Sequence, residues 1–183
     1  MINLSLARRY AKALLSIGKE DGRFKEYGEE LSSFAYLLER EAELQNAIVN
    51  PMYASDDRKK VLDKILEMIQ LSPIVTNFIN LLFDKQRIDG VLQINAVYQQ
   101  LVDQLENISR AKVTTATPLD EEMIDRIRQA LEKITGGTVV LEVADDPKII
   151  GGIVAQVGDL VLDGSVRTQL QSLKETLIRG EVA

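Results

Sequence analysis

The spacing of the apolar residues changes once along this chain of 183 residues, and the change limits the possible folds more than any other feature. From Leu4 to about Ile108, apolar side chains recur every three or four residues, the period of an amphipathic helix. From Ala111 they alternate with more polar ones, the period of a half-buried strand. The sequence therefore predicts two domains, a helical one over residues 1–108 and an α+β one over residues 109–183.

Six helices are expected in the first domain, and the short links between them favour antiparallel neighbours in a bundle. Ser72-Pro73 is the clearest start signal, because the hydroxyl can cap a helix and proline suits its first position. Asp56 or Asp57 is expected to cap the preceding helix, and Asp89-Gly90 to break the chain before the last one. The predicted fold class is thus α plus α+β, with an N-terminal six-helix bundle followed by a small C-terminal α+β domain.

The second domain is expected to contain a strand, a helix, a strand, a β-hairpin and a helix. The first helix should run from Thr117-Pro118 to Gly136-Gly137, where glycine is typical past a helix end. β-Branched residues predict a strand over Thr138–Ala144. The features predicted beyond it are a turn at Asp145-Asp146-Pro147, strands over Ile149–Val157 and Leu160–Leu162 joined at Gly158-Asp159, and a last helix bearing Val166, Leu170, Leu173 and Leu177.

The chain contains no Cys and no His, and this removes several classes of chemistry. A disulfide framework, a thiolate site, Ser-His or Cys-His catalysis and a typical zinc site are all excluded. The formal net charge of −6 argues against nucleic acid as a partner, because phosphate binding needs a concentrated basic surface. Only chemistry by carboxylates, Lys, Tyr or hydroxyl groups remains open to this composition. We predict no catalytic residue, no cofactor and no metal site.

The sequence also shows no membrane or export signal. No apolar run approaches the roughly 18 residues of a membrane span. The apolar residues at the N-terminus are interleaved with Arg8, Arg9 and Lys12, unlike those of a signal peptide. We expect a cytosolic, bacterial protein without direct membrane insertion, which reaches a membrane only through its partners.

Three short motifs near the C-terminus could bind ligands, but each has a structural interpretation. Asp145 and Asp146 could hold a divalent ion, yet neighbours in a sequence point apart, and a solvated turn explains them. Gly151-Gly152 lacks the Lys and hydroxyl of a phosphate loop, so we expect a bulge or a close approach of two backbones. Asp163-Gly164-Ser165 is interpreted as a turn and a helix cap. Arg167 could face an acidic partner or solvent.

Tyr10 lies in the first helix among small residues, with Ala7, Ala11 and Ala13 close in the sequence. Small residues allow another helix to lie near, and tyrosine adds contact area with a polar tip. The helix that follows Ser72 is apolar on more than one face, which exceeds what a single core-facing stripe needs. The residues alone leave two interpretations open, ordinary bundle packing or a groove in which both helices receive a partner helix.

Two segments at opposite ends of the chain resemble one known family. The segment Leu6–Leu14, LARRYAKAL, resembles the first helix of the delta subunit of rotary ATP synthases, called the oligomycin-sensitivity-conferring protein in mitochondria. The segment Ile149–Arg167, IIGGIVAQVGDLVLDGSVR, resembles the C-terminal signature of the same family. The signature positions, which the resemblance also implies as stalk contacts, are Gly151, Gly152, Asp159, Asp163, Gly164, Ser165 and Arg167.

The resemblance implies a non-catalytic subunit of the peripheral stalk, or stator, of an F-type ATP synthase at the cytoplasmic face of a bacterial cell membrane. Such a subunit ties the catalytic head to the b subunits, so that rotation of the central shaft is coupled to ATP synthesis. The helical domain would bind the N-terminal helix of an alpha subunit, and the C-terminal domain would bind the b subunits. The residues implied for alpha binding lie on the first and fifth helices: Ala7, Tyr10, Ala11, Leu14, Asn77, Leu81, Asp84 and Lys85.

Two other kinds of protein fit parts of the sequence. One is a helical adaptor or chaperone that binds amphipathic helices without belonging to an ATP synthase. The other is a small enzyme or ligand-binding regulator that uses Asp145, Asp146 or Lys148. The absence of His, Cys and a phosphate loop argues against this second kind.

Overall fold

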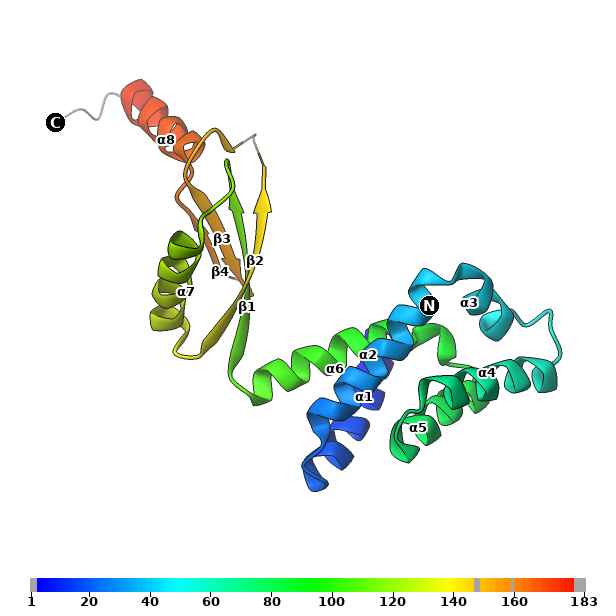
Figure 1. Ribbon diagram of the computed structural model, residues 1–183. Helices are drawn as coiled ribbons and strands as arrows, with labels where there is room; N and C mark the ends of the chain where they lie inside the picture. Colours follow the sequence, from blue (N-terminus) through cyan, green and yellow to red (C-terminus); the bar gives the residue numbers. More distant parts are fainter. Residues whose placement is uncertain (1–2, 147–148, 159, 180–183) are drawn as a thin grey trace. The chain divides into compact units, whose positions relative to one another are not determined.

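A computed structural model describes residues 3–146, 149–158 and 160–179, and the chain divides into two compact units at residues 103 and 104. The helices of the first part are α1 (Leu4–Glu20), α2 (Phe24–Arg40), α3 (Ala42–Val49), α4 (Ser55–Ile69), α5 (Pro73–Asp84), the 3₁₀ turn η1 (Ile88–Gly90) and α6 (Val91–Leu105) (Figure 1). The elements that follow are β1 (Ile108–Thr115), α7 (Glu121–Thr135), β2 (Thr138–Asp145), β3 (Ile153–Val157), β4 (Leu160–Asp163) and α8 (Val166–Arg179). The prediction of a helical part followed by an α+β part is confirmed.

One hydrophobic cluster joins all the helices of the first unit. Aromatic residues fill much of it, and Tyr27, Phe34 and Tyr98 are almost completely buried. The hydroxyl of Tyr98 donates a hydrogen bond of 2.7 Å to the carbonyl oxygen of Phe24, which ties α6 to the start of α2. Burial raises the pKa of Tyr98 to about 12, so this donor keeps its proton at any physiological pH.

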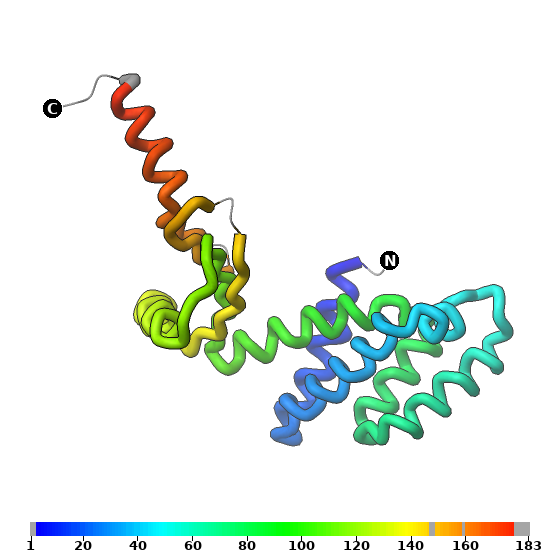
Figure 2. The backbone as a smooth tube through the Cα atoms, turned by 45° about the horizontal axis from the view of Figure 1, so that its top comes forward, coloured from blue at the N-terminus to red at the C-terminus, as the bar shows by residue number. Residues whose placement is uncertain are grey.

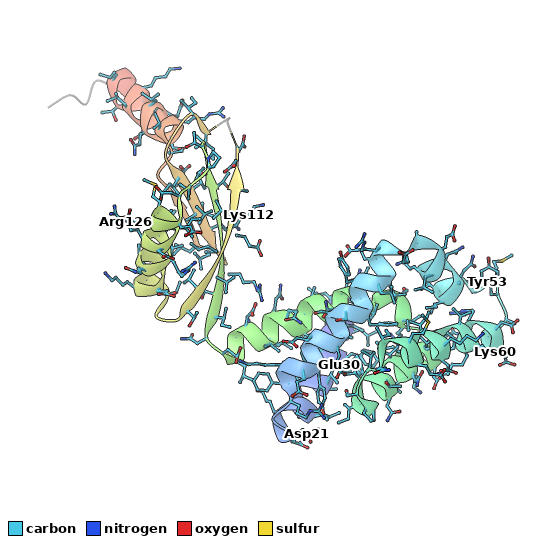
Figure 3. The ribbon with its side chains drawn as sticks, in the orientation of Figure 1. Asp21, Glu30, Tyr53, Lys60, Lys112 and Arg126 are labelled. Atoms are coloured by element: carbon cyan, nitrogen blue, oxygen red, sulfur yellow. The ribbon has the colours of Figure 1, made fainter. Side chains whose placement is uncertain are left out.

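The second unit is a four-stranded sheet with the strand order β2-β1-β3-β4. β1 pairs with β2 in parallel and with β3 antiparallel, and β3 and β4 form an antiparallel hairpin. The predicted alternation along β1 is confirmed, because Ala111, Val113 and Thr115 are buried while Lys112 is exposed. Figure 3 shows Lys112 on the side of the sheet away from α7, so α7 covers one face and leaves the other to solvent.

Two predicted helix starts are wrong. Neither Asp56 nor Asp57 caps α4, because Ala54 occupies the cap position and both aspartates lie in the first turn, where they favour the helix dipole. α7 does not begin at Thr117-Pro118. The side chain of Asp120 accepts a hydrogen bond of 2.7 Å from the Met123 amide and starts the helix there.

Two other boundaries also differ from the prediction, whereas the break at Asp89-Gly90 is confirmed, because α6 begins directly after it at Val91. β1 begins at Ile108, earlier than Ala111. The strand expected from Ile149 begins only at Ile153, since the φ angles of Ile150 and Gly152 are 68° and 84°, which a strand does not allow.

Most of the remaining turn and cap predictions are confirmed where the structure describes them, but Asp145, predicted in a turn, is the last residue of β2. Ser72 caps α5, and its Oγ accepts a hydrogen bond of 3.4 Å from the Val75 amide. Gly136 ends α7 in the left-handed conformation, and Gly158 has a φ of 57° between β3 and β4. Pro147 and Asp159, the other parts of two predicted turns, lie outside the described residues.

Candidate partner-binding surfaces

The residues predicted for alpha binding divide into a buried and an exposed group. On α1, the side chains of Ala7, Ala11 and Leu14 are completely buried and belong to the core of the first unit. Tyr10 is half-buried at the edge of that core. On α5, the predicted residues that reach solvent are Asn77, Leu81, Asp84 and Lys85. Any partner of these helices therefore meets Tyr10 and the α5 residues, while the buried residues of α1 only support them.

Tyr10 and Phe78 bring α1 and α5 into contact. Their rings meet edge to face, with centroids 6.3 Å apart and an interplanar angle of 71°. This arrangement places the positive edge of one ring against the negative face of the other. The helix that begins at Ser72 thus shares an aromatic contact with α1, as the groove interpretation requires.

Other apolar residues lie on the same sides of the two helices as Tyr10 and Phe78. Ile17 lies seven residues after Tyr10, on the same side of α1, and 42% of its surface is exposed. Leu81 lies three residues after Phe78 and is 44% exposed. We call these apolar positions the α1–α5 strip, which consists of Tyr10, Ile17, Ile74, Phe78 and Leu81.

Sequence reasoning missed Ile17, Ile74 and Phe78 as parts of this strip. All three fit the ordinary apolar stripe of their helices, and only burial separates the core side of a stripe from its exposed rim. Ile17 carried a usable signal, because it lies seven residues from Tyr10.

Both helices also expose charged residues. Arg8, Arg9 and Lys12 are exposed on α1, and no ion pair involves them within the part of the chain that the structure describes. Arg8 and Lys12 are each two residues from Tyr10, so they lie on the side of α1 away from the strip. Asp84 and Lys85 are exposed three and four residues after Leu81, on its side of the chain at the end of α5.

A carboxylate from α2 fixes the start of α5. One oxygen of Glu30 accepts hydrogen bonds of 2.9 Å from the backbone amide of Ser72 and 2.6 Å from its hydroxyl. The same hydroxyl faces the Val75 amide in the first turn of α5. Because Ser72 is buried, this network holds the helix that carries Phe78 and Leu81 in one position against α2.

The signature residues of the second unit build the junction between β4 and α8. Gly152 has a φ of 84°, and a Cβ atom there would overlap the carbonyl oxygen of Gly164. The Gly164 amide donates a hydrogen bond of 2.8 Å to the carbonyl oxygen of Ile153, and the Val166 amide donates one of 2.9 Å to the carbonyl oxygen of Gly151. The predicted close approach of two backbones is therefore confirmed at Gly152.

Asp163 and Ser165 cap α8 together, as predicted. Asp163 accepts a hydrogen bond of 2.9 Å from the Ser165 amide and one of 2.7 Å from the Thr168 hydroxyl. These bonds, that from the Ser165 backbone most strongly, hold the pKa of Asp163 below its usual value. Ser165 in turn accepts 3.2 Å from the Thr168 amide. Arg167 is exposed beside this cap, and Asp159 lies outside the described residues.

α8 exposes all four apolar side chains that the sequence predicts for this helix. Val166, Leu170, Leu173 and Leu177 are 38%, 55%, 57% and 59% exposed. Figures 1 and 2 both show α8 leading away from the sheet instead of lying on it. The pattern correctly predicts an amphipathic helix, but the three leucines of its apolar face remain more than half exposed.

The acidic residues considered as possible ligands do not gather with other acidic side chains into a metal-binding group in the described part of the chain. Among the described residues, no group of three or more acidic side chains is placed to hold a metal ion. Asp145 is exposed, with its carboxylate 3.4 Å from the Thr115 hydroxyl, and the Asp146 amide donates to the Thr115 carbonyl. Lys148 lies outside the described residues. Over the ranges 3–146, 149–158 and 160–179, no helix is both long and apolar enough to cross a membrane.

Comparisons with known proteins agree over nearly the whole chain. Residues 6–177 match the family model described as "ATP synthase delta (OSCP) subunit". A protein of Desulfosudis oleivorans and one of Desulfatibacillum aliphaticivorans, both named "ATP synthase subunit delta", are each 49% identical to this chain over 181 residues, which is 99% of both chains. A protein of the same name from Syntrophobacter fumaroxidans is 45% identical over 98% of each chain.

A solved structure has the same fold. A chain in the cryo-EM structure of the Toxoplasma gondii mitochondrial ATP synthase hexamer matches with a TM-score of 0.71, covering 94% of this chain and 97% of its own. At 20% sequence identity this likeness concerns the fold alone. None of these matches supports the alternative of a free-standing helical adaptor or chaperone.

Proposed function

Because the chain belongs to the ATP synthase delta (OSCP) subunit family, we propose that it tethers the catalytic head of the enzyme to the peripheral stalk. The protein is a non-catalytic subunit of the ATP synthase complex. In the proposal, residues 1–108 form the bundle that binds the head, and residues 109–183 bind the stalk. The subunit then resists the torque on the head, at the cytoplasmic face of a bacterial cell membrane, without entering the membrane itself.

The proposed partner of the first unit is the amphipathic N-terminal helix of an alpha subunit. The observation that carries this assignment is the α1–α5 strip, where Tyr10, Ile17 and Leu81 remain partly exposed beside a dense core. A helix laid on this strip would bury apolar surface without any rearrangement, since Glu30 and the core already fix both helices. The outer residues Asn77, Asp84 and Lys85 would contact the polar side of the same helix.

The proposed partners of the second unit are the b subunits. The signature residues from Gly151 to Arg167 place and cap α8, whose apolar side chains are exposed. Leucines at more than half exposure on one helix face are unusual for a surface without a partner.

Binding two neighbours through separate units strengthens the tether. Once one unit is bound, the other is held close to its own partner, and this high effective concentration raises the overall affinity by roughly 10²–10⁴ over either contact alone. Moderate affinities at both ends are therefore sufficient for a durable connection.

Titration of the full-length protein with a synthetic peptide of the alpha N-terminus, followed by calorimetry, tests the first contact. We expect Leu81→Asp and Tyr10→Asp to weaken binding by roughly a hundredfold, because each places a charge against the apolar face of the peptide. Met68→Asp is the matched control, since Met68 is 84% exposed on α4, outside the strip. Equal affinities for all three variants would remove the strip from the proposal.

A truncation tests the division of labour between the units. A protein that ends before Ala111 should retain the affinity for the alpha peptide and lose attachment to the b subunits. Pull-down with the soluble part of the b subunit measures the second property. Retention of the b subunit by the truncated protein would contradict the assignment of the stalk contact to residues 109–183.

A further inference from the structure

The apolar residues of α8 follow the spacing of a coiled-coil seam. Val166, Leu170, Leu173 and Leu177 are separated by four, three and four residues, which corresponds to the a and d positions of a heptad. A helix that packs on a sheet or in a globular core needs a wider apolar face, with about three positions in each heptad. The narrow seam of α8 thus fits a single helix as its partner.

Two basic residues lie along one side of this seam. Arg167 and Lys174 each follow a seam residue directly, and they are seven residues apart, so both occupy the same flanking position of the heptad. Gln169 and Thr176 occupy the flanking position on the other side. All four side chains are exposed. The seam is therefore basic along one edge and neutral along the other.

These charges disfavour a second copy of α8 as the partner. In an antiparallel pair the same flanking positions face each other, so Arg167 of one copy would oppose Lys174 of the other. In a parallel pair, Arg167 and Lys174 would face only neutral residues. Neither arrangement contains an opposite-charge pair across the seam.

The same unit also contains an apolar surface that α8 could occupy. An open groove of about 380 Å³ lies between α7 and the β3–β4 hairpin, and its wall includes Ile127, Ala130, Ile134 and Leu162. It reaches Asp163 and Gly164 at the root of α8. The cap formed by Asp163, Ser165 and Thr168 and the bond from Val166 to Gly151 hold α8 in its outward direction, away from this groove.

We propose that α8 is one strand of a two-helix coiled coil, and that its partner is a helix with a heptad seam of apolar residues and acidic side chains along the edge that meets Arg167 and Lys174. The inference rests on the proposed function, because it places the stalk contact along the whole of α8 and specifies the chemistry of the stalk helix that binds there. The signature residues act in it as the anchor that sets the direction of α8.

Binding of two designed peptides to the full-length protein tests the inference. Both peptides are three-heptad helices with Leu at the a and d positions. One carries Glu and the other Lys at the e and g positions, so neither associates with itself. Fluorescence anisotropy should show that the acidic peptide binds at least about tenfold more tightly than the basic one. Lys174→Glu should reduce this preference.

A pair of variants on neighbouring residues tests the seam. Leu173→Asp should weaken binding of the acidic peptide at least about tenfold, because it puts a charge into the seam. Ser172→Asp adds the same charge one residue away, off the seam, and should change the affinity less than about twofold. Circular dichroism should show the same helix content for both variants. No binding of the acidic peptide, equal loss in both variants, or equal binding of both peptides would overturn the inference.

Two further measurements test the two alternative partners of α8, the groove beside α7 and a second copy of the protein. The chain has no Cys, so spin labels attached through Glu175→Cys and Lys133→Cys report only the distance between α8 and α7. A short distance in the free protein would show α8 lying in the groove and would overturn the inference. Sedimentation that shows a dimer lost on Leu173→Asp would overturn it in favour of a second copy.

Binding to the soluble part of the b subunit separates this inference from the proposed function. If Leu173→Asp leaves that affinity unchanged, the assignment to α8 fails while the stalk attachment stands. If the wild-type protein binds the acidic peptide through α8 but does not bind the b subunit, the proposed stalk partner fails while the inference about α8 stands.

Discussion

The two units of this protein differ in how many of their apolar residues they bury. Among the described residues, 23 buried apolar residues form the cluster of the first unit, whereas the cluster of the second contains five. The second unit instead exposes the leucines of α8 and part of the β3–β4 hairpin. Since apolar burial is the main driving force of folding, the first unit can hold a preformed binding surface, and the second gains further stability when a partner covers it.

The tyrosines allow the units to be followed separately. All five lie in the first unit, at positions 10, 27, 36, 53 and 98, and the chain has no Trp. Tyrosine fluorescence therefore reports unfolding of the first unit, while circular dichroism reports both. The following variants use this difference.

The largest effect is expected from a cavity in the large core. Phe34 is completely buried on α2, so Phe34→Ala should lower the free energy of unfolding of the first unit by about 3–5 kcal/mol. Urea denaturation followed by tyrosine fluorescence measures it. A loss below about 1 kcal/mol would show that the core of the first unit is loosely packed, and would contradict the difference between the two units.

The second effect concerns the anchor of α8. Gly152→Ala should destabilise the second unit by about 1–3 kcal/mol or more, since it adds a Cβ at a positive φ against the carbonyl of Gly164. Gly136→Ala is the control, because Gly136 has a similar φ of 71° and open space around it, and should cost only about 1 kcal/mol. Circular dichroism at 222 nm measures both variants. Equal losses would mean that the contact with Gly164 is unimportant.

A smaller effect should depend on pH. The pKa of Asp163 is lower in the folded protein than in the unfolded chain, because the Ser165 amide and the Thr168 hydroxyl bind its charged form. Its contribution to stability is thus present above about pH 4, the unfolded pKa, and is lost as the pH falls through the folded pKa. We expect helicity in α8 to decline in acid more steeply in the wild-type protein than in Asp163→Asn. Circular dichroism during acid titration measures this helicity. The same decline in both proteins would show that the Asp163 cap does not stabilise α8.

The smallest effect on stability is expected from an exposed leucine of α8. Leu173 is 57% exposed, so Leu173→Ala should change the stability of the isolated protein by less than about 0.5 kcal/mol. A loss of 2 kcal/mol, close to that of a core leucine, would show that α8 packs against its own unit in solution. Thermal unfolding followed by circular dichroism distinguishes the two outcomes.

Local signals predicted most elements of both units. The structure confirms two predicted helix starts and one predicted helix end, at Ser72-Pro73, Asp163-Gly164-Ser165 and Gly136. These were predictable because caps depend on residues adjacent in the sequence. The wrongly predicted starts of two other helices, at Asp56 or Asp57 for α4 and at Thr117-Pro118 for α7, lie two or three residues from the true cap positions. Which of several neighbouring polar groups caps a helix depends on the direction in which the chain enters it, and this direction is set by tertiary packing.

The sequence determined the family of this protein, the order of its helices and strands, and the amphipathic character of each helix, since all three reside in the identity and spacing of residues along the chain. The tertiary structure decided which apolar residues are available to a partner. Leu14 and Leu170 occupy equivalent positions on amphipathic helices, yet Leu14 is completely buried and Leu170 is 55% exposed. Periodicity defines an apolar face, but only the neighbours packed on that face determine whether it belongs to a core or to an interface.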